Sequence, residues 1–230
     1  MFCEIQMLSI NQFRKEFDTK VLERGVTWEA LGFYASDGSV YPFGTDTKVL
    51  STVFESFCAP LILEIAENHK YTVVFAKQTI YPDFTLTPAG KASERIAIDV
   101  KTTYQENDRR IGFTLGSYTS FLRNGTKNIS FPYNQYLGHW VIGFVYRRCE
   151  GVAAKVHELQ KSENPTCPYK DVQYFIQEKY KIAGKRPGSG NTTNMGSILT
   201  ADIEDLRQGN GPFSALGERA FEEYWRHYEK

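Results

Sequence analysis

Three charged side chains interrupt two apolar stretches of the chain and could together act on a phosphate group. Asp83 lies in the stretch 81–84, and Asp99 and Lys101 lie in the stretch 96–101. Both stretches are rich in β-branched, aromatic and other apolar residues, a composition typical of strands that are at least half buried. Charged groups are almost never fully buried without partners, so an aspartate and a lysine inside an apolar strand need a reason.

Alternation along the second stretch places Asp99 and Lys101 on the same face of the predicted strand, with its aliphatic residues on the other. If Asp83 comes alongside on a neighbouring strand, two carboxylates and an ammonium surround one point. Magnesium is typically held by one or two carboxylates together with substrate phosphate, and a lysine stabilises charge at phosphorus. The pattern predicts metal-dependent phosphodiester chemistry. A structural ion pair is the alternative.

Glu55 is a candidate third carboxylate. It lies on a predicted helix that Thr45 or Asp46 can cap. By helical angle, Glu55 lies nearly opposite the apolar stripe, which consists of Val49, Leu50, Val53, Phe54 and Phe57. A solvated surface glutamate is the simpler interpretation. Glu55 joins the site only if its face of the helix borders the two aspartates.

The uncharged segment 188–194, Gly-Ser-Gly-Asn-Thr-Thr-Asn, is the second unusual feature. It lacks the Lys-Ser/Thr ending of a nucleotide-binding P-loop, which excludes that interpretation. By composition it is a surface loop. The functional alternative is direct contact with base edges, because asparagine bonds adenine, threonine methyls touch the thymine methyl, and glycines let the backbone approach closely.

Length and composition limit the class of protein. The chain has 230 residues, of which 41% are hydrophobic and 14% aromatic, enough for one substantial core. Lys+Arg and Asp+Glu both number 27. The balance argues against a sequence-independent polycation but allows a local basic face, and the segment 101–127 has an excess of basic residues.

Neither a targeting signal nor a metal-binding arrangement of cysteines is apparent in the sequence. The four cysteines are scattered without zinc-ligand spacing and indicate reduced thiols. We expect no secretion signal at the N-terminus and no membrane-spanning segment, and therefore a cytoplasmic protein without a membrane partner.

The expected architecture is an α/β fold of the α+β type, a mixed β-sheet flanked by helices, in a single domain spanning 1–230. Periodicity predicts helices over 8–24, from 45 or 46 onward, and over 216–228; Pro60 is expected to kink or end the second. A hairpin is expected over 32–43 with its turn at 36–39. Further strands are expected near 71–76, 82–86, 95–103, 111–115, 139–146 and 172–177, and 149–170 is expected to be irregular.

Taken together, these stretches resemble type II restriction endonucleases of the PD-(D/E)xK nuclease superfamily. The resemblance is carried, in order, by the segments 44–55, 81–86, 96–104, 118–124, 188–198 and 224–226. It extends over most of the chain from Gly38 to Tyr228 and is far more specific than the Asp-x-Lys spacing.

The resemblance implies a restriction-endonuclease-like homodimer that binds double-stranded DNA at a short palindrome. It implies hydrolysis of one phosphodiester on each strand with Mg²⁺, at GATATC, with a blunt cut at the centre. Dimerisation elements are expected near 1–45 and 149–170, much of which resembles the family poorly. The host is expected to carry a protective DNA methyltransferase that is not a stable partner.

The resemblance also implies roles for single residues. Asp83 and Asp99 match the metal-binding carboxylates, Lys101 the catalytic lysine, and Glu55 the auxiliary acid, which we count with the catalytic and metal-binding residues.

Further positions match DNA contacts of the family. The segment 188–194 matches the loop that contacts bases in the major groove, namely Gly188, Ser189, Gly190, Asn191, Thr192, Thr193 and Asn194. Gln78 and Thr79 match a minor-groove loop that is shorter and poorer in amides here. The positions that match contacts near the DNA backbone or the scissile phosphate are Thr102, Thr103, Ser120 and Lys127.

Two other functions share part of the pattern. A structure-specific or repair nuclease of the same catalytic class has the acidic cluster but needs no base-contacting loop. A DNA-binding protein without catalysis would use the cluster only as an ion pair.

Overall fold

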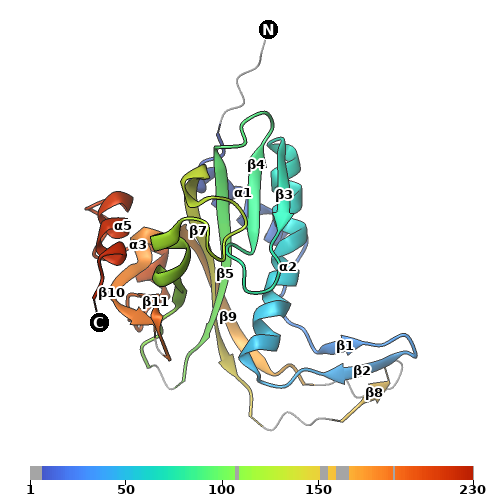
Figure 1. The fold of residues 1–230 in the computed structure, drawn as a ribbon. Helices are drawn as coiled ribbons and strands as arrows, with labels where there is room; N and C mark the ends of the chain where they lie inside the picture. Colours follow the sequence, from blue (N-terminus) through green and yellow to red (C-terminus); the bar gives the residue numbers. More distant parts are fainter. Residues whose placement is uncertain (1–6, 107–108, 151–154, 159–165, 189, 230) are drawn as a thin grey trace.

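The computed structural model describes residues 7–229 except 107–108, 151–154, 159–165 and 189 (Figure 1). Its centre is a five-stranded sheet in the order β3-β4-β5-β7-β9. The strands are β3 (Tyr71–Phe75), β4 (Phe84–Pro88), β5 (Arg95–Tyr104), β7 (Tyr136–Arg148) and β9 (Tyr169–Glu178). β5 and β7 pair in parallel and the other neighbours pair antiparallel, so the expected mixed sheet is confirmed.

Two helices cover one face of this sheet: α1 (Ile10–Glu23) and α2 (Thr47–Asn68). Asp46 caps α2, because its Oδ1 accepts hydrogen bonds from the backbone N–H groups of Lys48 and Val49. The apolar stripe of α2 packs on the sheet, where the ring of Phe54 stacks on that of Phe144 with 4.5 Å between centroids. These contacts make a rigid apolar layer behind β5.

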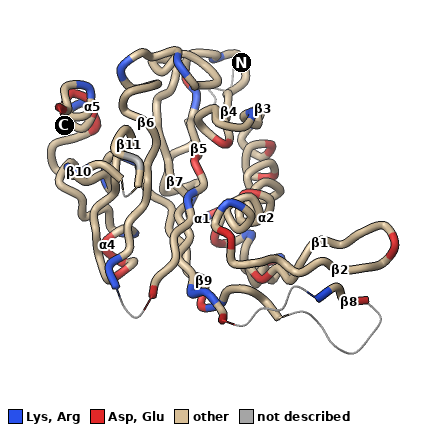
Figure 2. Tube along the Cα trace, turned by 60° about the horizontal axis from the view of Figure 1, so that its bottom comes forward, with Lys and Arg blue, Asp and Glu red and all other residues tan. Residues whose placement is uncertain are grey.

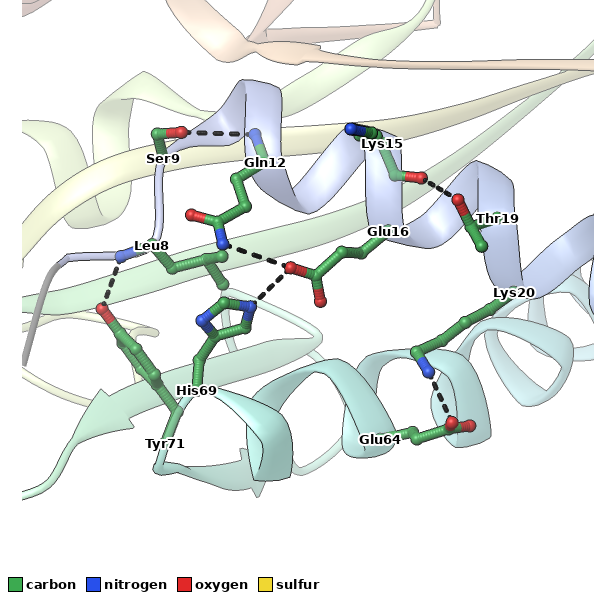
Figure 3. A network of polar contacts seen from close by, with 10 residues as sticks. All are labelled: Leu8, Ser9, Gln12, Lys15, Glu16, Thr19, Lys20, Glu64, His69 and Tyr71. Atoms are coloured by element: carbon green, nitrogen blue, oxygen red, sulfur yellow. Dashed lines mark hydrogen bonds and ion pairs between the residues drawn. The ribbon is translucent and has the colours of Figure 1, made fainter.

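Polar contacts hold α1 against α2 at the edge of this layer (Figure 3). Glu16 of α1 accepts a 2.6 Å hydrogen bond from His69, the residue that ends α2. Lys20 pairs with Glu64 of α2, and the Tyr71 hydroxyl accepts a hydrogen bond from the backbone N–H of Leu8. The side-chain pairs join the two helices along their lengths, and the Tyr71 contact joins the chain before α1 to β3 (Figure 3).

Of the two outcomes expected at Pro60, a kink or the end of the helix, the second does not occur, because α2 continues to Asn68. A proline inside a helix costs about 3 kcal/mol, but Leu61, Ile62 and Ile65 on the next turns are fully or almost fully buried. Burial of each such side chain contributes about 1.5–3 kcal/mol and outweighs the lost hydrogen bond. By length and composition α2 is also apolar enough to cross a membrane. Its buried face accounts for that composition, since it forms part of the core.

The opposite face of the sheet carries a second, smaller sheet in the order β10-β11-β6 (Figure 1). Its strands are β10 (Ala183–Gly188), β11 (Asn191–Ser197) and β6 (Thr114–Ser117). The turns η1 (Tyr118–Leu122) and η2 (Tyr133–Gln135) and the helices α3 (Lys179–Ile182), α4 (Ile203–Gln208) and α5 (Glu218–Arg226) complete this side. A second core lies here, with Trp225 fully buried beside Tyr118. β6 begins later than expected, since Ile111 forms only an isolated bridge with Thr200.

A third sheet projects from the body of the molecule at the lower right of Figure 1. It consists of β1 (Gly32–Tyr34), β2 (Ser39–Pro42) and β8 (His157–Glu158). The expected hairpin over 32–43 is confirmed, and Gly38 adopts the positive φ of +87° that its turn requires. The segment 149–170 is less irregular than expected, because it contains β8 and the start of β9. Its parts 151–154 and 159–165 lie outside the described residues.

The first residue of α5 is a half-buried carboxylic acid. Burial, followed by the charges of Glu222 and Glu178, raises the pKa of Glu218 to about 7, and the nearby Lys179 acts in the opposite direction. A raised pKa in the folded state favours the protonated form. The contribution to stability is therefore fully present below the unfolded pKa near 4.5 and is lost as the pH rises through about 7.

Glu218→Gln removes this pH-dependent loss of stability. We expect the variant to melt at a higher temperature than the unmodified protein at pH 8, with the difference shrinking as the pH falls to 5.5, as measured by calorimetry. For a chain of this size each kcal/mol corresponds to about 2–4 °C. Glu223→Gln, on the exposed side of the same helix, is the control. An equal shift for Glu218→Gln at both pH values would contradict the assignment.

Candidate active site and nucleic-acid interface

The pairing of β4 with β5 brings the two predicted aspartates together. Phe84 lies opposite Ile98 in this antiparallel pair, so the next step of the register places Asp83 opposite Asp99. The Asp83 Oδ2 atom accepts a 2.7 Å hydrogen bond from the backbone N–H of Val100. Asp83 comes just before β4 rather than inside it. The expected juxtaposition is confirmed.

Alternation along β5 separates the core from the site. Ile96, Ile98 and Val100 are buried in the core beneath α1 and α2. Asp99 and Lys101 face the other side, and the Lys101 Nζ donates a 2.7 Å hydrogen bond to Asp99 Oδ1. Figure 2 shows acidic and basic positions following one another along β5.

Burial and mutual charge set the protonation of this cluster. Burial, followed by the charge of Asp99, raises the pKa of Asp83 to about 7. Burial also opposes ionisation of Asp99, but Lys101 and Lys179 together hold the pKa of Asp99 below its usual value. Burial works against the charge of Lys101, yet the Asp99 and Asp83 carboxylates raise the pKa of Lys101 above its usual range. The cluster therefore holds an ionised Asp99 beside a permanently charged ammonium.

Glu55 is not the solvated surface glutamate of the simpler interpretation. Its side chain is half-buried, and its Oε1 accepts a long hydrogen bond of 3.5 Å from the Ser51 hydroxyl. Burial raises the pKa of Glu55, Lys101 lowers it, and Asp99 raises it further. Glu55 thus lies within electrostatic reach of the aspartates.

The donor atoms of the cluster fit a magnesium ion. They are carboxylate oxygens, which magnesium prefers, and Asp99 Oδ2 has no hydrogen-bond donor among the described residues. The described part of the chain contains no group of three acidic, histidine or cysteine side chains arranged to hold a metal ion. Two aspartates completed by water and a substrate phosphate match the way proteins usually bind magnesium.

Sequence reasoning missed a second lysine at this cluster, which, unlike Lys101, is buried. Lys179 is 2% exposed, and its Nζ lies 3.6 Å from Asp99 Oδ2 and 3.8 Å from the centre of the Tyr81 ring. The run Glu178-Lys179-Tyr180-Lys181 is polar and indicates an exposed connection, so nothing in the sequence singles out Lys179.

The glycine-polar segment forms a β-hairpin rather than a loop. Gly188 pairs with Asn191, Gly190 has a φ of +74°, and the residues from Asn191 to Asn194 belong to β11. The Tyr118 hydroxyl donates a 2.8 Å hydrogen bond to the carbonyl of Thr192, which anchors the hairpin to η1. Ser189 and the side chain of Asn191 lie outside the described residues.

The other predicted DNA contacts differ in accessibility. Gln78 and Thr79 are exposed in the turn between β3 and β4, and Lys127 is exposed. Thr102 and Thr103 continue β5 beyond Lys101 and are half-buried. Ser120 is buried, and its hydroxyl donates a 2.8 Å hydrogen bond to the carbonyl of Lys127. Ser120 therefore shapes the turn that presents Lys127.

A basic groove of about 840 Å³ lies beside the hairpin. Its lining includes the basic residues Arg109, Arg110, Lys185 and Arg186, together with one acidic residue, Glu106, and Thr103 of β5. All four basic residues are exposed. A chain of zero net charge thus has the local basic face that its composition allowed.

Comparison with known proteins identifies the family. The family model of the restriction endonuclease EcoRV matches residues 24–230. The type II restriction enzyme EcoRV of Escherichia coli is 44% identical over 221 residues, which cover 94% of this chain and 89% of the relative. With its paired aspartates, adjacent lysine and mixed sheet flanked by helices, the chain belongs to the EcoRV family of type II restriction endonucleases, which are site-specific deoxyribonucleases.

Proposed function

We propose that this enzyme is a Mg²⁺-dependent homodimer that cuts both strands of GATATC bluntly at its centre. The observation that carries the proposal is the cluster of Asp83, Asp99 and Lys101, in which two carboxylates and an ammonium converge at one end of the β4–β5 pair. The similarity to EcoRV and the uncharged hairpin 188–194 support the sequence specificity.

Each member of the cluster has a separate role in this proposal. Asp83 and Asp99 hold the magnesium ion, with Glu55 as an auxiliary acid. Bound magnesium would supply an activated water and neutralise charge on the scissile phosphate. Lys101, whose side chain is 26% exposed, reaches the phosphate and stabilises the charge that develops there. Although burial opposes its charge, the neighbouring Asp99 and Asp83 carboxylates raise the pKa of Lys101 and favour the cationic form that this role requires.

Specificity is assigned to the hairpin and the basic groove. Asparagine and threonine side chains of the segment 188–194 contact base edges in the major groove, and the glycines allow the backbone to approach. Gln78 and Thr79 approach the minor groove. Thr102, Thr103 and Lys127 contact the DNA backbone and fix the register of the enzyme on the duplex.

The projecting hairpin of β1 and β2 supplies the proposed dimer contact. Phe33 and Tyr41 are cross-strand neighbours and are 58% and 48% exposed, and Tyr34 beside them is 67% exposed. Large exposed apolar side chains on one element mark an interaction surface. A C₂ dimer presents the same hairpin 188–194 to each half of a palindrome. The enzyme would act in the cytoplasm beside a methyltransferase that protects the host site.

Digestion of two plasmids that differ only by one GATATC site tests the proposed activity. With Mg²⁺, the plasmid with the site is expected to yield one linear product with blunt ends, and the other to stay intact. Asp99→Ala is expected to abolish cleavage while keeping much of the binding to DNA, because the hairpin and the groove remain.

The rival functions give different results in the same assay. Preference for a branched substrate over the linear palindrome would indicate a structure-specific nuclease. Full cleavage by the Asp99→Ala variant would show that Asp99 is not part of the active site. Absence of cleavage by the unmodified protein with every metal ion tested would indicate a DNA-binding protein without catalysis.

Asn194→Ala tests the hairpin as the base-contacting element. Loss of one bidentate base contact should reduce discrimination between GATATC and noncognate DNA by about 1–3 kcal/mol. Competition binding measures this loss. Lys127→Ala is the contrasting variant, since removal of a phosphate contact weakens binding equally on all sequences and reduces the salt dependence. An equal loss on all sequences for Asn194→Ala would show that the hairpin contacts only the backbone.

Phe33→Asp tests the dimer contact. A charge buried in an apolar interface is strongly unfavourable, so sedimentation is expected to show a monomer that no longer cuts both strands. Leu216→Asp, at a position that is 61% exposed outside the projecting hairpin, is the control and should remain dimeric. Dimeric Phe33→Asp would place the interface elsewhere.

A further inference from the structure

We propose that Lys179 is a positioning residue for cleavage, which fixes the Asp99 carboxylate and links it to the base of the hairpin 188–194. The inference rests on the proposed function and adds a residue to it.

Lys179 is a buried charge with few partners of its own. Its side chain is 3% exposed, and its ammonium makes no hydrogen bond among the described residues. A buried cation is unfavourable for stability unless it is well paired, and a 3.6 Å ion pair without a hydrogen bond is weak compensation. Folding stability alone does not explain this lysine.

Two lysines bracket the Asp99 carboxylate from different sides. Lys101 donates a hydrogen bond to Oδ1, whereas Lys179 faces Oδ2. Lys101 remains partly accessible, while Lys179 is enclosed. Lys179 therefore acts on the substrate only through Asp99, by holding the plane of its carboxylate.

The same ammonium also contacts the segment that carries Asp83. It lies 3.8 Å from the centre of the Tyr81 ring, in a cation–π arrangement, and 5.5 Å from that of Phe121. The Tyr81 ring stacks on Phe121 at 4.2 Å, and its hydroxyl hydrogen-bonds to the buried His139 at 2.8 Å. Tyr81 is two residues before Asp83. One ammonium thus contacts both segments that present the carboxylates.

Lys179 also begins the segment that leads into the hairpin 188–194. It is the first residue of α3, and β10 starts at Ala183 directly after that helix. Ile182 and Ala183 are fully buried, and the Ile182 carbonyl accepts a 2.9 Å hydrogen bond from Ile198, just after β11. The base of the hairpin is therefore rigid. A shift of the hairpin on contact with bases reaches Asp99 through Lys179.

Lys179→Met tests this role, because methionine keeps much of the volume and removes the charge. Lys181→Met is the matched control: Lys181 lies on the same short helix but is 31% exposed and pairs with Glu178. Three quantities are measured in both variants: thermal stability in EDTA, affinity for Mn²⁺ by calorimetry without DNA, and single-turnover cleavage of GATATC and of a site with one altered base pair.

For Lys179→Met we expect stability in EDTA close to that of the unmodified protein, because removal of a buried, weakly paired cation offsets the loss of its attraction to Asp99. We expect Mn²⁺ to bind at least as tightly, because a competing cation has left the cluster. The cognate cleavage rate should nevertheless fall by about tenfold or more, since misplaced catalytic groups have effects of this size. The cleavage rate at the altered site should fall by a smaller factor. The ratio of the cognate rate to the altered-site rate should therefore decrease. Lys181→Met should leave all three quantities unchanged.

A structural ion pair gives the opposite result: lower stability in EDTA, with Mn²⁺ affinity and the cleavage ratio unchanged. That result would overturn the proposal. Lys179→Gln is measured in parallel, and failure of both variants to fold would also overturn it. If the unmodified enzyme does not cut GATATC, the proposed target is wrong, while Mn²⁺ binding without DNA still tests the link between Lys179 and Asp99.

Discussion

The site depends on holding two carboxylates side by side within a buried sheet. The register of β4 against β5 places Asp83 opposite Asp99, where burial and mutual repulsion both oppose ionisation. Three groups offset this: the backbone N–H of Val100 donates a hydrogen bond to Asp83, Lys101 donates one to Asp99, and the Lys179 ammonium forms an ion pair with Asp99. In the proposed reaction, a divalent cation would offset the remaining repulsion between the two carboxylates. In the proposed function, this unfavourable electrostatic interaction would favour the binding of a divalent cation.

The two faces of the central sheet have different roles, since one stabilises the fold and the other carries the candidate site. The face beneath α1 and α2 is filled by aliphatic and aromatic side chains, and Phe54 stacked on Phe144 is typical of it. That layer fixes β5 so firmly that polar groups can occupy its other face. There, buried polar atoms of Lys179, His139 and Asp99 lack hydrogen-bond partners among the described residues. Such incompletely satisfied groups are expected where function rather than stability selects the residue.

Local sequence patterns predicted the strands of the central sheet, the hairpin of β1 and β2, three of the helices and one side of the site. Alternation along 96–101 placed Asp99 and Lys101 on one face, and helical spacing located α1, α2 and α5. The features that local patterns did not predict depend on contacts between residues that are distant in sequence. The burial of α2 overrides Pro60, and pairing with β6 turns the loop containing Asn194 into a strand. Within the polar run 178–181 only Lys179 is buried, and its ammonium lies against the rings of Tyr81 and Phe121, which are distant in sequence.

Charge placement separates binding from cutting in the proposed mechanism. Basic residues line the groove beside the hairpin, so the phosphates of DNA are attracted there in the absence of metal. The acidic cluster repels the scissile phosphate until a cation neutralises it, so binding to DNA alone does not lead to hydrolysis. Because Lys179 connects the base of the hairpin with Asp99, the geometry required for that cation depends on the fit of the hairpin to the bases. Specificity in cleavage then exceeds specificity in binding, since both the base contacts and the metal site must be in place.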